Sequence, residues 1–155
     1  LLVLLLGASK IDAQTEAELE KLSIFSEYVK SKNYDAAYAP WMELRTTTPK
    51  LNKAIYIFGE RILKDKISNS EGDQKITYIL DLLKLWEERS VNFSKITPKG
   101  AYLAKASQLK YDNRNLLGES NEILYANFDS AYNSDVKTFT NPKSLSQSLK
   151  KKQRN

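Results

Sequence analysis

The sequence predicts an all-α protein, an α-solenoid of about three helical hairpins. Lys, Glu, Leu, Ala and Ser dominate the composition and favour helix, while five Gly and four Pro leave few turns for an all-β fold. Apolar residues recur at spacings of three and four along most of the 155 residues. A short segment typical of a helix boundary occurs three times, as Thr48-Pro49-Lys50, Thr97-Pro98-Lys99 and Asn141-Pro142-Lys143.

Each of these boundaries follows the expected end of one helix and precedes the expected start of another. Pro supplies the φ angle wanted at a first helical position, and the Thr or Asn before it can cap that helix. Each interval between boundaries is long enough for two helices and their turns. We therefore expect an array of helical hairpins, with a plain helical bundle as the alternative.

Residues 1–13 are typical of the later part of a secretory signal peptide. The apolar run Leu1–Leu6 is too short to span a bilayer, and small residues follow it up to Ala13. The basic n-region is missing from this sequence. We expect cleavage between Ala13 and Gln14 and export to the periplasm, with an extracellular location or an uncleaved, buried N-terminal helix as alternatives.

The helical repeat array is expected over residues 15–139. Its first helix ends before a tight turn at 31–33, and its second covers about 34–45. Pro40 lies inside the second helix, which therefore either starts late, near Ala39, or is kinked. The expected inward residues of these two helices are Leu19, Leu22, Ile24, Phe25, Tyr28, Val29, Ala37, Tyr38, Trp41 and Leu44.

Four further helices are expected at about residues 49–67, 73–93, 98–111 and 119–133. Gly59 costs about 1 kcal/mol relative to Ala in mid-helix, so we expect a neighbouring helix to approach closely there. The expected inward residues are Ile55, Phe58, Gly59, Ile62, Leu63, Ile76, Ile79, Leu80, Leu83, Trp86, Tyr102, Leu103, Ala106, Leu109, Ile123, Leu124, Phe128 and Ala131. Both tryptophans are thus expected in the core rather than at a ligand.

Residues 140–155 begin a seventh helix and end in a basic tail, which we expect to be disordered. The last 13 residues carry the whole net charge of +5, and the preceding chain is balanced. This distribution is not typical of a phosphate-binding face, so no nucleic-acid partner is expected. The last apolar face stops in a run of Lys without a capping helix. We therefore expect a truncated or frameshifted longer array, with possible self-association through its uncapped end.

The residue types exclude several kinds of chemistry. There is no Cys and no His, which removes thiol nucleophiles, the usual zinc ligands and the commonest general base. Glu87 and Glu88 are adjacent on a helix and point apart, so they make no acid–base pair. We expect no catalytic residue, no cofactor and no metal, and hence no enzyme.

The first hairpin resembles a tetratricopeptide repeat. That family has a large residue late in the first helix, a Gly/Asn-Tyr turn, a small residue in the second helix, then an aromatic and a terminal Pro. Tyr28, Asn33-Tyr34, Ala37, Trp41 and Pro49 fill these places in order and at the family's spacing. The later units match more loosely. The leader followed by repeats is also similar to exported repeat proteins of Bacteroidota, in which Ala-Gln often marks cleavage.

The resemblance implies a groove lined by the first helix of each hairpin, which binds an extended peptide or a helix. The matching positions are Ser26 and Lys30 in the first unit, and Tyr56, Glu60 and Lys64 in the second. Lys30 and Lys64 are one repeat length apart and would together clamp an acidic side chain or a terminal carboxylate. Ordinary solvated lysines are the alternative.

These observations predict a non-catalytic scaffold or adaptor of the cell envelope whose partner is an envelope protein or peptide. One alternative is a small helical enzyme or ligand carrier, which a tightly bound small molecule or a hydrolase activity would indicate. Another is an oligomerising structural subunit, which the molecular mass in solution would identify.

Overall fold

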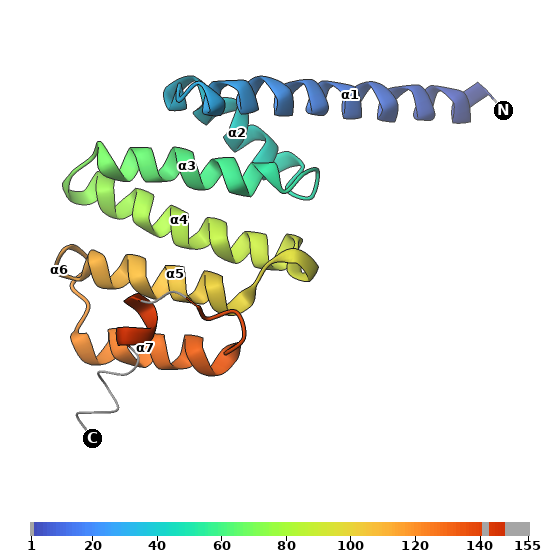
Figure 1. The fold of residues 1–155 in the computed structure, drawn as a ribbon. Coiled ribbons are helices and arrows are strands. Elements are labelled where there is room, and N and C mark those ends of the chain that lie inside the picture. Colours follow the sequence, from blue (N-terminus) through green and yellow to red (C-terminus); the bar gives the residue numbers. More distant parts are fainter. Residues whose placement is uncertain (1, 141–142, 148–155) are drawn as a thin grey trace. The chain divides into compact units, whose positions relative to one another are not determined.

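The computed structural model describes residues 2–140 and 143–147, with side chains from residue 15 onward. These residues form helices and no strand, which confirms the all-α prediction. The chain divides into two compact units, Leu1–Lys66 and Ile67–Asn155. Helices that follow one another pack as adjacent pairs within each unit, as in a helical repeat protein (Figure 1). Among the described residues, no helix has the length and apolarity needed to cross a membrane.

The first unit contains α1 (Leu2–Lys30), α2 (Tyr34–Thr47) and nearly all of α3 (Ala54–Ser68). α1 begins at Leu2 rather than near residue 15, so the expected leader is continuous with the first helix of the array. α2 begins before Pro40 and continues through it, which excludes the late start near Ala39.

The expected tight turn between α1 and α2 is confirmed, and Lys32 is its central residue. Lys32 has a φ of 60°, in the left-handed region that favours glycine. Its N–H donates to the Val29 carbonyl at 3.1 Å, and the Asn33 N–H donates to the Tyr28 carbonyl at 2.8 Å. These two bonds form a Schellman motif, which ends α1. The Asn33 side chain then accepts from the Ala36 N–H at 3.4 Å and caps α2.

Trp41 joins α2 to α3. Its side chain is fully buried, as expected, and its Nε1–H donates to the Ile55 carbonyl at 2.8 Å. A Cβ placed on Gly59 would lie 2.5 Å from Trp41 Nε1, so the indole occupies the space beside this glycine. The expected close approach at Gly59 is confirmed, and its cause is an aromatic side chain of the neighbouring helix.

The start of α3 corrects the expected role of the Thr-Pro boundaries. α3 begins at Ala54, and its first N–H groups are bonded by Asn52 rather than by Thr48. Thr48 is the residue directly after α2, and its hydroxyl donates to the preceding Leu44 carbonyl at 3.4 Å. The Thr97 hydroxyl likewise donates to a preceding carbonyl, at 2.8 Å. Both threonines therefore end the helix before them and do not cap the one after.

The second unit contains α4 (Gly72–Asn92), the short 3₁₀ helix η1 (Ser94–Ile96), α5 (Lys99–Asp112), α6 (Arg114–Leu117) and α7 (Asn121–Ser134). α6 lies in the segment expected to be a loop. α5 and α7 run side by side, and residues 143–147 form a further helical turn (Figure 1). Ser144 in that turn is fully buried, and its hydroxyl donates to the Ala104 carbonyl at 3.2 Å. The expected disorder therefore does not apply to residues 143–147, and the basic tail lies outside the described residues.

The buried face of α5 consists of small residues. Gly100, Ala104 and Ser107 are buried, whereas the side chains expected there lie on the flanks and are half-buried: Tyr102, Leu103, Ala106 and Leu109. Phe128 and Phe139 fill the core against Ala104. The expected face of α5 is wrong because it was assigned from apolar spacing, whereas the neighbouring segments approach so closely that small residues form the buried face.

Gly100 is the site of closest approach. A Cβ there would lie 2.8 Å from the Phe139 nitrogen and from Thr138 Oγ1. The Gly100 N–H donates to Thr138 Oγ1 at 2.8 Å and to Asp135 Oδ2 at 3.3 Å. The hydrogen bonds from Thr138 and Gly100 lower the pKa of Asp135 below its usual value. A carboxylate from the loop after α7 thus caps the positive end of α5, where Pro98 makes no side-chain cap.

Candidate functional site

The predicted groove residues lie on α1 and α3, which are in contact within the first unit. The rings of Phe25 and Phe58 meet edge to face with centroids 5.9 Å apart. The two helices run in the same direction (Figure 1). Lys30 and Lys64 both follow this aromatic contact, toward the carboxyl ends of their helices. Equivalent positions of two successive repeats are expected to be arranged in this way.

Each of the two lysines pairs with a glutamate on its own helix. Lys30 Nζ lies 2.7 Å from Glu27 Oε1, and Lys64 Nζ lies 2.7 Å from Glu60 Oε1. The lysine side chains are 58% and 57% exposed, so these are solvated pairs of the kind worth about 0.2–0.5 kcal/mol. Because an ammonium group carries three N–H donors, a partner's carboxylate can bind without displacing the glutamate.

Two predicted groove residues are less accessible than the lysines. Tyr56 is only 1% exposed, so its ring belongs to the core and lines no open surface. Ser26 is half-buried, and its hydroxyl donates to the Leu22 carbonyl at 2.5 Å. The Glu60 side chain is only 13% exposed, and its carboxylate is held by Lys64. The accessible part of the predicted site is therefore its two lysines, and Glu27 adds an exposed carboxylate beside Lys30.

An apolar residue joins this face of α1. Leu19 lies seven residues before Ser26 and eleven before Lys30, a spacing that places all three on one side of the helix. Its side chain is 49% exposed instead of inward as expected. Periodicity alone assigned Leu19 to the core. An exposed apolar side chain on the same face of the helix can add an apolar contact to those that the charged pairs make with a peptide. We call Leu19, Glu27, Lys30, Glu60 and Lys64 the α1/α3 surface.

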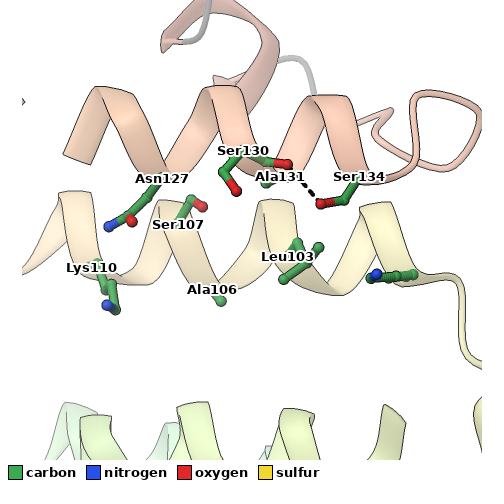
Figure 2. A pocket seen from close by; sticks show the side chains of 9 residues that line it. Leu103, Ala106, Ser107, Lys110, Asn127, Ser130, Ala131 and Ser134 are labelled. Atoms are coloured by element: carbon green, nitrogen blue, oxygen red, sulfur yellow. Dashed lines mark hydrogen bonds between the residues drawn. The ribbon is translucent and has the colours of Figure 1, made fainter. Parts of the chain in front are cut away.

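A depression lies between α5 and α7 in the second unit (Figure 2). Its volume is about 320 Å³. Lys99 and Lys110 lie among its lining residues, and most of the others are small or polar: Leu103, Ala106, Ser107, Asn127, Ser130, Ala131 and Ser134. Sequence reasoning did not identify this site, because its residues are individually unremarkable and come from two helices about 20–30 residues apart.

No protein-family model, curated protein or solved structure matches this chain. Within residues 15–140 and 143–147, no group of three or more His, Cys, Asp or Glu is placed to hold a metal ion.

Proposed function

We propose that this chain is a non-catalytic scaffold or adaptor built from tetratricopeptide-like hairpins, and that its α1/α3 surface binds a peptide or helix of an envelope protein. The observation that carries the proposal is the contact between α1 and α3, with an exposed lysine on each helix. Adjacent, parallel helices with regularly placed charges suit recognition of an elongated partner. Leu19 adds an apolar contact to the charged ones.

The local features of the first unit support the resemblance. The Schellman motif at Lys32 produces a short turn between antiparallel helices. Trp41 against Gly59 is a large residue of one hairpin packed on a small residue of the next. Trp41 is among the positions that suggested a tetratricopeptide-like unit, and it is closely packed here.

The test is a capture experiment from the envelope fraction of the source organism. The bait is the chain from Gln14, as the original sequence and as Lys30→Glu/Lys64→Glu. The matched control is Lys84→Glu/Lys95→Glu, which makes the same change of charge at exposed lysines of the second unit. We expect one partner to be captured by the original and the control and lost with the first variant. Equal capture by all three baits would refute the α1/α3 surface as the binding site.

We also propose that the chain is exported and that residues 1–13 are removed. The support is the apolar run and the small residues that precede Gln14. Intact mass spectrometry of the protein from its native envelope is expected to give a chain that begins at Gln14. Recovery from the cytoplasmic fraction with residues 1–13 attached would refute export.

Self-association is a second candidate, favoured by two exposed apolar side chains on the opposite flank of α1. Ile24 is 46% exposed and Tyr28 is 37% exposed, and they lie one turn apart. Light scattering would show a concentration-dependent dimer that Ile24→Ser/Tyr28→Ser abolishes. A monomer at all concentrations would exclude this candidate.

A further inference from the structure

We propose that the depression between α5 and α7 is a second binding site, specific for an extended peptide with an acidic side chain at each end. This site is separate from the α1/α3 surface and does not depend on it. We call it the α5/α7 trough. Its long axis follows the two helices, because its residues extend from Lys99 to Lys110 on α5 and from Asn127 to Ser134 on α7.

Three uncharged polar side chains of the trough are available to a ligand. Ser107 is only 5% exposed, and Figure 2 shows its side chain pointing from α5 toward α7. Among the described residues, the hydroxyls of Ser107 and Ser130 and the amide of Asn127 make no hydrogen bond with the rest of the chain. These groups face the open depression, so they can form hydrogen bonds with an occupant at the expense of water alone.

The charged groups that line the trough indicate the charge of its occupant. Lys99 and Lys110 supply ammonium groups, and no Asp or Glu is among the lining residues. Lys110 Nζ lies 3.4 Å from Glu119 Oε1, which holds the ammonium in place and leaves donors for a ligand. Hydroxyl and amide groups between the lysines can donate to peptide carbonyls. The occupant is therefore rich in acceptors and negatively charged.

The distance between Lys99 and Lys110 indicates the length of the peptide that can reach both. Lys99 and Lys110 lie three turns apart on α5, about 16 Å along the axis at 1.5 Å per residue. An extended chain covers about 3.3 Å per residue, so this distance corresponds to a peptide of about five residues. Ala106 and Ala131 in the trough are small enough to let a peptide backbone approach.

The probe is a synthetic five-residue peptide with glutamate at both ends and alanine and serine between them. It is titrated into the full chain while the Asn127 side-chain amide and the Ala106 and Ala131 methyl groups are followed by NMR. We expect shifts concentrated on these groups and a loss of binding when both glutamates are replaced by glutamine. A three-residue version and free citrate, which cannot reach both lysines, are expected to bind at least about fivefold more weakly.

Single variants distinguish the trough from general attraction to lysines. We expect Lys99→Gln and Lys110→Gln each to weaken binding about three- to tenfold, and Ser107→Ala about threefold. Lys95→Gln, an exposed lysine outside the trough, is the matched control and should change nothing. Circular dichroism of each variant verifies that it is folded, and Lys99→Gln changes an exposed side chain only.

Three results would overturn the proposal. One is equal weakening by Lys95→Gln and Lys99→Gln. Another is an equal shift of alanine methyl groups outside the trough. The third is the absence of shifts in the trough at millimolar peptide, which would mean that water alone fills it. Because Lys30→Glu/Lys64→Glu should bind the probe normally, failure of the α1/α3 surface and failure of the trough are distinguishable.

Discussion

Replacing Gly59 by alanine tests how closely α2 and α3 approach. On an isolated helix this change stabilises by about 1 kcal/mol, because alanine loses less conformational freedom than glycine. Here the new Cβ would lie 2.5 Å from Trp41 Nε1 and 2.6 Å from Trp41 Cε2, well inside van der Waals contact. Trp41 is fully buried, so its ring has no free space to enter. Overpacking of this kind costs about 1–3 kcal/mol.

A second cost arises at the indole nitrogen. Any shift of the ring lengthens the 2.8 Å hydrogen bond from Trp41 Nε1 to the Ile55 carbonyl, which is worth about 1 kcal/mol. The two losses outweigh the gain in helix propensity. We expect Gly59→Ala to lower the free energy of unfolding by about 2 kcal/mol, measured by urea denaturation with circular dichroism.

A double-mutant cycle identifies the cause of this destabilisation. Trp41→Leu removes the clashing ring and is itself destabilising, because it leaves a cavity. In that background Gly59→Ala is expected to be neutral or to stabilise by up to about 1 kcal/mol, as helix propensity alone dictates. If Gly59→Ala stabilised the protein with Trp41 present, or cost the same in both backgrounds, the proposed contact would be refuted.

Two further predictions concern the turn at Lys32 and the cap of α5. Lys32→Gly should raise the free energy of unfolding by about 0.5–1 kcal/mol, because Lys32 has a φ of 60°, and a lower denaturation midpoint would contradict this. Hydrogen bonds lower the pKa of Asp135 in the folded protein, so its ionised form stabilises the fold above the usual aspartate pKa of about 4. This stabilisation is lost as the pH falls through the lowered pKa. The stability difference between the original and Asp135→Asn should therefore be constant near neutrality and shrink below about pH 4, and a pH-independent difference would refute the cap.

The positions of most helices could be predicted from the sequence, because apolar spacing reports directly on a helix with one buried side. Phe25, Val29, Trp41 and Trp86 are buried as that spacing predicts. Turns were harder to predict in detail. The Thr-Pro pairs mark true boundaries, yet their hydroxyls bond backward to carbonyls, since a threonine side chain can serve either neighbouring helix.

Burial was mispredicted where it depends on a partner that the sequence does not reveal. Ile24 and Tyr28 follow the apolar period of α1 but remain exposed, and Tyr56 is buried although the repeat pattern places it in a groove. The cap of α5 by Asp135 joins positions 35 residues apart, and local capping patterns cover only about four residues. Of the α1/α3 surface, the sequence indicated both lysines and Glu60 and missed Leu19 and Glu27.

The small-residue face of α5 explains why the second unit has a trough at all. Gly100, Ala104 and Ser107 follow one another at helical spacing on that face. Beside Gly100 the loop that begins at Asp135 fills the space, and at Ala104 the hydroxyl of Ser144 bonds the backbone carbonyl. Ser107, the third of these residues, lines the depression between α5 and α7. A hydroxyl at this third position suits a polar occupant, whereas an alanine there would have suited packing alone. The small-residue face of α5 therefore contributes at Gly100 to the cap of the helix and at Ser107 to the candidate binding site.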